Sequence, residues 1–348
     1  MAHSKPHYSF FLLSHVLIAI FCGVNASSIP STTRIIPSTT VTGPVTVQTV
    51  SDNTPINFPK LSAVNDTTPE FWFFAAVSPD LNASATVTFF TTTEDGFEFV
   101  GDSGSVDTVL VQITFPNGTS FSTELAASEA VITSSTGDLT DTADDVSGSI
   151  SITAIAPPHY PFSPVEPGQT LEVAPNLGWE NAVPGATANV KVNIQGTPVE
   201  FTGIGYQDHN WSPAPFLSIF SSYYWGLTQL GPYTLVWFDV FDLSGVEHVS
   251  SYVAANGAII VAEKGSNTVV PFGANDEFPP HAGDGDPTGF NITVDLGKEG
   301  ILEATVTAEV VLAEVEGLFT RWISKAEGGI KGGTQYEGPA MNEEFRLT

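Results

Sequence analysis

Residues 201–216, FTGIGYQDHNWSPAPF, hold a dense group of hydrogen-bonding and aromatic side chains for a chain that is only 14% charged. In an extended strand, successive side chains point to opposite faces of the sheet. The motif therefore divides into two sets, with Tyr206, Asp208 and Asn210 on one face and Gln207, His209 and Trp211 on the other. Asp208 and His209 are thus not expected to form a dyad. The structural alternative is a strand end whose Asp and Asn cap a turn and whose His and Trp lie in a core.

The rest of the chain has a β-rich composition. Its 348 residues are 42% hydrophobic, which is enough for two domains, or one large one, with a substantial core. Thr, Val, Ser, Gly, Pro and Phe dominate. The formal net charge is −28, and so acidic a surface should repel nucleic acid and anionic membranes. The expected partners are neutral or apolar small molecules, and the oligomeric state is left open.

The first 26 residues predict a secretory signal peptide. Lys5 precedes an apolar run from Phe10 to Phe21, and small residues follow before Ser27. The run is short for a transmembrane helix, although an uncleaved anchor is the alternative. Cleavage would remove Cys22, the only cysteine, and with it any thiol chemistry or cysteine-ligated zinc. We therefore expect a protein of the secretory pathway, or a secreted one, with no stable membrane insertion after cleavage.

Asn-x-Ser/Thr sequons agree with that destination. The predicted glycosylation sites are Asn65, Asn82, Asn117 and Asn291. Asn210 also begins a sequon, but it lies inside the central motif and Pro213 follows its Ser212.

Short apolar runs separated by turn signals predict strands along most of the chain. Glu70 to Ser78, EFWFFAAVS, is apolar on both faces, which is typical of a strand buried on both sides or lining a cavity with its second face. Asn256-Gly257 is a strong hairpin turn. Only Glu316 to Lys325 has the pattern of a helical turn or two. Many short strands and few helices indicate an all-β fold.

Two similar halves predict two tandem β-barrel or β-sandwich domains. The stretch Pro157 to Gly185 is rich in proline, so we expect an ordered crossing rather than a helix or a central strand. That crossing places the boundary near residue 195. Residues 27–195 would then form an N-terminal β domain and residues 196–348 a C-terminal β-barrel domain.

Familiar catalytic and metal-binding motifs are missing from the sequence. Gly101 to Gly104 resembles the segment around a serine-peptidase nucleophile, but it sits in an expected loop without any other peptidase motif. The histidines after residue 26 lack the HxH and HExxH spacings of zinc sites. No glycine-rich loop leads into a helix, as phosphate binding requires. We therefore expect no metal and no cofactor.

What remains is a set of aromatic side chains with a few polar groups among them. A concave, mainly apolar pocket with a handful of hydrogen-bonding groups suits an apolar ligand. The candidate walls are Trp72, Phe74, Tyr206, Trp211, Tyr224, Trp225 and Trp237, with Asp239 two residues beyond the last. The alternative is that many of these rings belong to the core.

The central motif resembles a known family. GxGYxDHNW at Gly203 to Trp211 follows the Trp-containing strand at 71–78 and precedes Trp-x-Asp at 237–239. This arrangement is similar to the carotenoid 1,2-hydratase-like superfamily of tandem lipocalin-like domains, and within it to the fungal Diels–Alderase group. The resemblance covers nearly all of the chain after residue 26. Gln207 stands where the family commonly has a His, and Ser212 where a Gly usually follows the Trp.

The resemblance implies a lipocalin-like C-terminal barrel and a substrate pocket at or near the interface of the two domains. It also implies a stereoselective [4+2] cycloaddition, of the Diels–Alder or hetero-Diels–Alder type, in fungal secondary metabolism. A protein accelerates such a concerted step by holding diene and alkene in reacting geometry and by hydrogen-bonding a carbonyl. The substrate would be a small apolar polyketide or terpenoid, such as an o-quinone methide with an alkene. The candidate catalytic residues are Gln207, Asp208, His209 and Asn210.

Two other functions stay open. One is a non-catalytic, lipocalin-like binder of apolar ligands. The other is a hydratase or dehydratase, which needs a general acid beside an alkene; Asp208 or Asp239 with a raised pKa would meet that requirement.

Overall fold

The computed structural model describes residues 19–21, 33–100, 104–133, 138–142 and 146–348. The expected signal peptide lies outside these residues, except for the short strand β1 (Ala19–Phe21), which pairs in parallel with β7 (Glu129–Thr133). Most of the peptidase-like segment at 101–104 also lies outside them. Among the described residues, no helix has the length and apolar character needed to cross a membrane.

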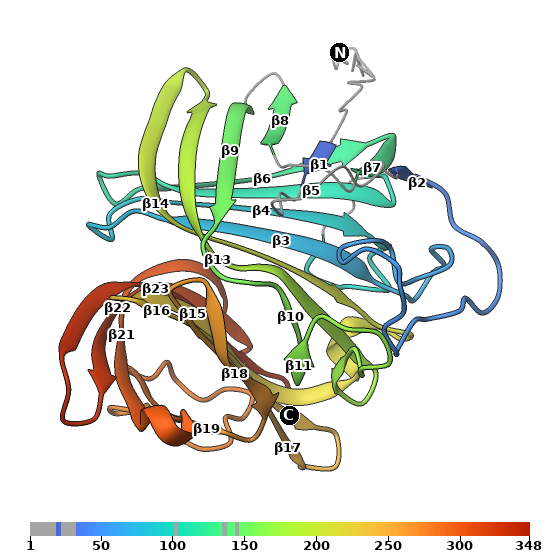
Figure 1. Cartoon of the computed structure of the whole chain (residues 1–348). Helices are drawn as coiled ribbons and strands as arrows, with labels where there is room; N and C mark the ends of the chain where they lie inside the picture. Colours follow the sequence, from blue (N-terminus) through green and yellow to red (C-terminus); the bar gives the residue numbers. More distant parts are fainter. Residues whose placement is uncertain (1–18, 22–32, 101–103, 134–137, 143–145) are drawn as a thin grey trace, which may run out of the picture.

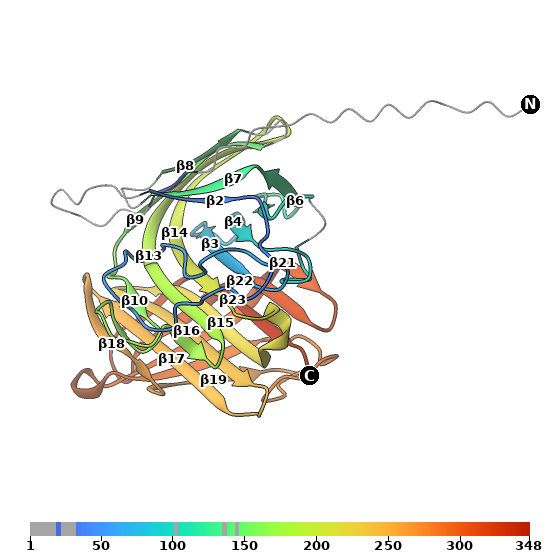
Figure 2. The same ribbon diagram turned by 90° about the vertical axis from the view of Figure 1, so that its right-hand side faces the viewer.

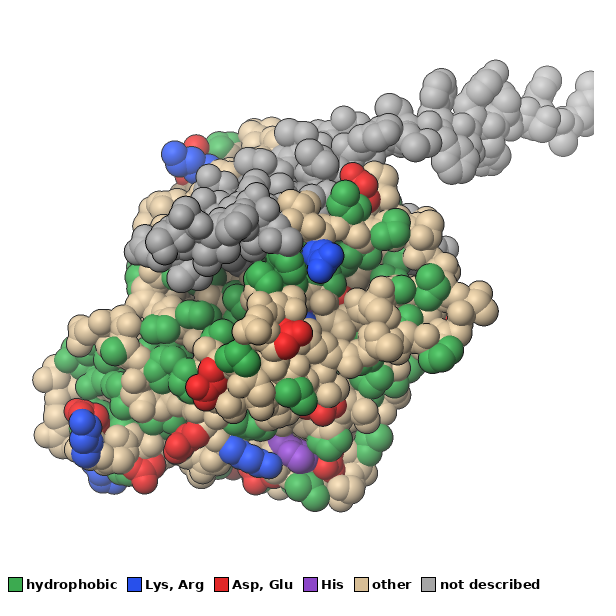
Figure 3. All heavy atoms as spheres, turned by 45° about the vertical axis from the view of Figure 1, so that its right-hand side comes forward, with side chains coloured by type: hydrophobic (Ala, Val, Ile, Leu, Met, Phe, Trp, Pro, Cys, Tyr) green, Lys and Arg blue, Asp and Glu red, His purple; other side chains and the backbone are tan. Residues whose placement is uncertain are grey.

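The described chain is almost entirely β-sheet, which confirms the all-β prediction (Figure 1). It forms an eleven-stranded sheet, a nine-stranded sheet and a small three-stranded sheet in the order β1-β7-β2, where β2 is Thr33–Pro37. The helical elements described are two single 3-10 turns, η1 (Phe216–Ser218) and η2 (Gly297–Glu299). Acidic and basic side chains lie scattered over the face shown in Figure 3.

The first sheet follows the order β11-β10-β13-β14-β3-β4-β5-β6, with β8, β9 and β12 paired to its side. The strands along its centre and far edge are β13 (Leu177–Ile194), β14 (Thr197–Trp211), β3 (Glu70–Val77), β4 (Ser84–Thr91), β5 (Asp107–Thr114) and β6 (Ser120–Ala127). The remaining strands are β8 (Asp138–Thr142), β9 (Val146–Ala154), β10 (His159–Tyr160), β11 (Ser163–Pro164) and β12 (Glu172–Ala174). Every residue of β3 and β4 is buried, as expected for a strand covered on both faces.

The second sheet is antiparallel throughout and curls into a barrel in the order β18-β17-β16-β15-β23-β22-β21-β20-β19 (Figure 1). Its strands are β15 (Phe220–Leu230), β16 (Tyr233–Asp242), β17 (Glu247–Ala255), β18 (Ala258–Lys264), β19 (Asn267–Phe272), β20 (Gly289–Asp295), β21 (Ile301–Val315), β22 (Phe319–Ile330) and β23 (Gln335–Arg346). Alternate residues fill the barrel with one core that includes Leu235, Phe290 and Trp322. The intervening residues face outward and share a second core with the first sheet.

The chain passes from the first sheet to the second between Trp211 and Phe220, later than the boundary expected near residue 195. Gln195 and Gly196 form a two-residue hairpin turn between β13 and β14, and both have positive φ, at 51° and 84°. Such turns join neighbouring antiparallel strands of one sheet. The whole 203–211 motif is therefore part of the first sheet. Figure 2 shows β13 and β14 as long strands running down toward the second sheet.

Two other local expectations are wrong. The segment Glu316 to Lys325 is not helical, because β22 begins at Phe319 and pairs on both sides with β21 and β23. The proline-rich crossing contains the start of β13, a central strand. Pro184 is tolerated there because the register of β13 against β14 shifts between Val183 and Ala186, so the missing N–H falls at a bulge.

Candidate active site between the two sheets

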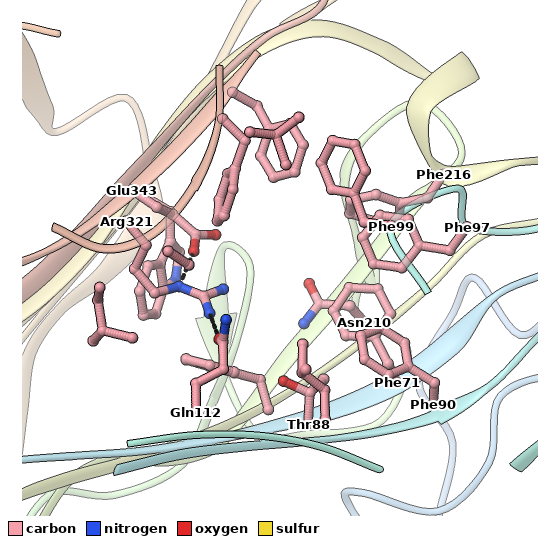
Figure 4. Close-up of a pocket in the computed structure, with 18 of the residues that line it drawn as sticks. Phe71, Thr88, Phe90, Phe97, Phe99, Gln112, Asn210, Phe216, Arg321 and Glu343 are labelled. Carbon is pink, nitrogen blue, oxygen red and sulfur yellow. Dashed lines mark hydrogen bonds and ion pairs between the residues drawn. The ribbon is translucent and has the colours of Figure 1, made fainter. Parts of the chain in front are cut away.

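A cavity of about 400 Å³ lies between the first sheet and the outer face of the barrel, in agreement with the pocket expected at the domain interface (Figure 4). The floor comes from β14, β3, β4, β5 and β6, and the roof from β15, β16, β21, β22 and β23. Three phenylalanines outside the strands, Phe97, Phe99 and Phe216 of η1, close one end. Most of the lining is apolar and aromatic, which is the usual character of a site for a drug-sized molecule.

Cross-strand register builds the floor in rows, because directly opposed residues of neighbouring strands share a face. One row runs Asp208, Phe73, Thr88, Leu110 and Glu124 across five strands. A second row runs Asn210, Phe71 and Phe90. A third row, one pleat further along, ends in Gln112 and Ser122. The 203–211 motif thus supplies the polar edge of a largely phenylalanine floor.

The roof carries an ion pair. Glu343 on β23 lies between Trp225 on β15 and Arg321 on β22. Its carboxylate accepts hydrogen bonds from Arg321 Nε at 2.6 Å and from the Tyr223 hydroxyl at 2.9 Å. The Arg321 guanidinium lies 4.4 Å from the centre of the Phe73 ring, so it reaches from the roof to the floor.

Asp208 is a buried carboxyl at the floor of the cavity. Its Oδ2 accepts hydrogen bonds from the Trp179 indole at 3.0 Å and from the Tyr206 hydroxyl at 2.9 Å, and its Oδ1 accepts one from the Asn210 amide at 2.9 Å. Burial raises the pKa of Asp208 to about 7, although the bonds from Trp179 and Tyr206 lower it. The negative charge of Glu343 raises it further. At neutral pH both forms are populated, which suits a group that gives and takes a proton.

Gln207 and His209 lie on the opposite face of β14, as the alternation predicts. Both side chains form buried hydrogen bonds with other residues of the protein. His209 Nδ1 is 3.0 Å from Glu180 and Nε2 is 2.9 Å from Glu70, while Lys60 pairs with Glu180 at 3.1 Å. Burial lowers the pKa of His209, but these two hydrogen-bonded carboxylates outweigh it and hold the pKa above its usual value. The ring also stacks on Trp72 at 4.4 Å.

The Gln207 amide is paired with the Asn57 amide, with hydrogen bonds of 2.9 Å in each direction. Together with Lys60 and His209, this pair fastens the segment around residues 57–60 to the back of the sheet. Gln207 and His209 therefore do not reach the cavity, in contrast to their expected place at the catalytic site.

The other expected walls fall in three places. Trp225 lines the cavity, and Tyr206 reaches it through its bond to Asp208. Trp72 and Phe74 lie on the back of the first sheet, and Trp211 packs there beside His209. Inside the barrel lie Tyr224, Trp237 and Asp239. Burial raises the pKa of Asp239 to about 8, but this carboxyl is separated from the cavity by the barrel wall.

The sequence interpretation missed Phe71 and Phe73, which alternate with Trp72 and Phe74 and face the cavity instead of them. It also missed Arg321 and Glu343. Their signal is a charged residue whose same-face neighbours, two positions away on either side, are both apolar: Phe319 and Ile323 around Arg321, and Met341 and Phe345 around Glu343. The helical pattern expected for Glu316 to Lys325 does not place Arg321 on a strand beside Glu343.

Of the predicted glycosylation sites, Asn82, Asn117 and Asn291 are exposed, while Asn65 is half-buried and its amide donates to the Gly43 carbonyl. Within the part of the chain that the structure describes, no cluster of three or more His, Cys, Asp or Glu residues has the geometry of a metal site.

Comparison with known proteins supports the family resemblance of the 203–211 motif. A family model described as Diels-Alderase-like matches residues 31–141 and 134–270. The quinolone epoxide rearrangement protein asqO of Emericella nidulans is 32% identical over 334 residues, which cover 88% of this chain and 91% of that protein. The corresponding protein penF of Penicillium thymicola is 34% identical, covering 86% and 91%. Diels-Alderase poxQ of Penicillium oxalicum is 28% identical over 118 residues, covering 32% of this chain and 26% of that protein.

Solved structures show the same fold. The crystal structure of CghA with Sch210972 superposes with a TM-score of 0.73 at 17% identity, covering 91% of this chain and 99% of that one. A putative AttH from Nitrosomonas europaea has a TM-score of 0.52 at 15% identity, covering 87% and 100%. The tandem lipocalin-like architecture is therefore confirmed, and the extent of the sequence matches assigns the chain to the Diels-Alderase-like family.

Proposed function

We propose that this protein is an isomerase that rearranges an epoxide on a largely aromatic substrate, with Asp208 as the proton donor. The observation that carries the proposal is a carboxyl with a pKa of about 7 at the floor of a phenylalanine-lined cavity. The two relatives that match most of this chain are named for the rearrangement of quinolone epoxides. A quinolone epoxide is accordingly the substrate class that we assign to the cavity.

The chemistry needs one proton and no co-reactant. The neutral Asp208 carboxyl donates its proton to the epoxide oxygen while one C–O bond breaks, which leaves a carbocation and a neighbouring hydroxyl group. Migration of an adjacent group to the cation turns the hydroxyl-bearing carbon into a protonated carbonyl. The Asp208 carboxylate then takes that proton back, so the product is an isomer of the substrate. General acid catalysis of this kind contributes about 10²–10⁴-fold in rate.

The aromatic lining supports a cationic intermediate. The rings of Phe71 and Phe90 form the floor beside Asp208, and Phe97 closes the end next to them, whereas the Phe73 ring already carries the Arg321 guanidinium. The face of an aromatic ring attracts a positive charge, and the attraction is stronger where water is excluded. An enclosed apolar site also keeps water away from the carbocation, because water would otherwise add to it and form a diol.

The ion pair of the roof supplies fixed charge opposite the acid. Glu343 is near enough to Asp208 to affect its pKa, and it is held by Arg321 and Tyr223. Two carboxyl groups in different environments can take different roles in one reaction. We assign proton transfer to Asp208, and we assign to Glu343 the role of holding Arg321 and of raising the pKa of the acid.

A [4+2] cycloaddition is the second candidate, and the Diels-Alderase-like family match favours it. The same cavity would then hold a diene and an alkene in reacting geometry, and Asp208 or Asn210 would hydrogen-bond a carbonyl group. This reaction needs a hydrogen bond but no transferred proton.

Product analysis by chiral chromatography tests the proposal. The purified protein is incubated with a quinolone epoxide and, separately, with a linked diene and alkene, each against a sample without protein. Accelerated formation of one rearranged stereoisomer from the epoxide supports the rearrangement, and acceleration of the diene reaction alone supports the cycloaddition. Unchanged products in both samples, with ligand binding retained, would identify a carrier instead of an enzyme.

A further inference from the structure

The cavity has two unlike ends. Figure 4 shows phenylalanine rings, including Phe71, Phe90 and Phe97, gathered on one side, and Arg321 with Glu343 and Gln112 on the other. An apolar group has its natural place among the rings. The polar end needs a partner of its own, because the hydrogen-bonding groups there are not fully used by the protein.

Gln112 is the least committed of these groups. Its amide oxygen accepts two long hydrogen bonds, from Thr86 at 3.3 Å and from Arg321 Nη1 at 3.4 Å. Its amide nitrogen has no hydrogen-bond partner among the described residues. Long hydrogen bonds are weak, so a ligand can replace them at small cost. A primary amide presents a donor and an acceptor side by side, and its complement is an edge with an acceptor beside a donor.

The charge at this end favours a neutral ligand. Glu343 already compensates the charge of Arg321, and Glu124 and Glu314 line the same cavity. An acidic head group would therefore meet net negative charge. A neutral carbonyl, by contrast, can accept a hydrogen bond from the guanidinium or from the Gln112 amide.

The spacing of the floor fixes how the ligand lies. Gln112 on β5 and Asp208 on β14 are three strands apart, which is roughly 14 Å at the usual separation of about 4.8 Å between strands. The Arg321 guanidinium, above Phe73 on β3, lies along this line. A substrate held at Gln112 must therefore be elongated to bring its reacting carbons to Asp208.

We propose that Gln112 and Arg321 select a neutral ring whose edge carries a C=O beside an N–H, as in a lactam. The ring edge pairs with the Gln112 amide, and the carbonyl also accepts from Arg321. This assignment rests on the proposed function for the position of the substrate in the cavity, and it makes Gln112 a specificity-determining residue.

Binding measurements on a catalytically blocked protein test this pairing. In the Asp208→Asn background, calorimetry compares a bicyclic lactam epoxide with its N-methyl analogue. We expect N-methylation to weaken binding about tenfold, since it removes one buried hydrogen bond. In Gln112→Leu the same methylation should cost less than about twofold, because the partner amide is gone. Gln335→Leu, at the exposed first residue of β23, serves as the matched control and should keep the full tenfold difference.

Gln112→Glu guards against misfolding of the Leu variant, since it keeps an acceptor for the N–H and should keep the discrimination. The proposal would be overturned if N-methylation weakened binding equally in the Asp208→Asn protein and in the same protein with Gln112→Leu. It would also be overturned if the Asp208→Asn protein bound the two ligands with equal affinity. Failure of the proposed function would give a different result. The lactam would bind with the expected discrimination, but the protein with Asp208 intact would leave the epoxide unchanged.

Discussion

Asp208 and His209 are adjacent in sequence, yet they lie on opposite faces of β14 and carry out opposite tasks. Asp208 faces the cavity as a carboxyl with a pKa of about 7. His209 faces the back of the sheet, where Glu70 and Glu180 raise its pKa and favour the imidazolium form. Its positive charge slightly lowers the pKa of Asp208 through the strand. One short motif thus supplies both the chemistry of the site and the attachment of the strand that carries it.

Replacing Asp208 by Asn removes the proton while keeping a side chain of the same shape. We expect kcat for the rearrangement to fall by about 10²–10⁴-fold with little change in substrate affinity. Single-turnover kinetics and calorimetry measure the two effects separately. Asp276→Asn, at an exposed loop position, is the control and should retain full activity. An Asp208→Asn protein with the parent's rate would remove Asp208 from the mechanism.

Tyr206 tunes the acid. Its hydroxyl donates to Asp208 Oδ2 at 2.9 Å and thereby favours the carboxylate form. Tyr206→Phe should therefore raise the pKa of Asp208, by about one unit, because a hydrogen bond to a charged group is worth about 1.5–3 kcal/mol. The pH at which kcat declines should move upward by the same amount. A variant with an unshifted pH profile would show that this bond does not act on the acid.

Two phenylalanines of β3, Phe71 at the cavity and Phe74 in the core, allow a comparison of the two faces of the strand. Phe71→Leu keeps an apolar side chain but removes an aromatic face beside the reacting carbons, so kcat should fall about fivefold, the equivalent of about 1 kcal/mol. Phe74→Leu makes the same change on the back of the strand and should lower stability without lowering kcat. Equal effects of the two substitutions on kcat would contradict the placement of the substrate on the Phe71 face.

His209→Gln tests the attachment on the back of the sheet. Removing the imidazolium leaves Glu70 and Glu180 buried with only Lys60 as a counter-charge, so the free energy of unfolding should fall by about 3–5 kcal/mol. Urea denaturation near pH 6 measures this loss. His281→Gln replaces an exposed histidine and should change little.

The same pair of proteins gives a pH test. The pKa of His209 is raised in the folded state, so its stabilising contribution is fully present below the unfolded value of about 6.5 and is lost as pH rises through the folded value. The difference in unfolding free energy between the parent and His209→Gln should therefore shrink as the pH rises above about 6.5. A difference that grows over this range would mean that His209 is neutral in the folded protein.

Strand periodicity predicts more of this site than composition does. Alternation alone divides Tyr206, Asp208 and Asn210 from Gln207 and His209, and the structure agrees. Period alone does not say which face meets the second domain, because β3 is apolar on both sides. The sequence therefore predicts Trp72 and Phe74 as walls, whereas the structure places Phe71 and Phe73 at the cavity.

Long-range register lies beyond the local pattern. Arg321 and Glu343 meet because β22 and β23 are paired neighbours, and they share a cavity with Asp208 only because the barrel packs its outer face on the first sheet. The turn at Gln195-Gly196 also could not be assigned from the local sequence. A glycine-containing turn can connect two strands of one sheet or two domains, and only the pairing of β13 with β14 shows that it is a hairpin within the first sheet.

The pH dependence of kcat for quinolone epoxide rearrangement tests the central claim most directly. If Asp208 donates the proton, kcat is constant at low pH and falls tenfold per pH unit above about 7, as the acid form is lost. The Asp208→Asn protein should show only a low rate without this decline. A parent rate that stays flat from about pH 5 to 9 would contradict proton donation by Asp208 and leave a proton-independent cycloaddition or a carrier role.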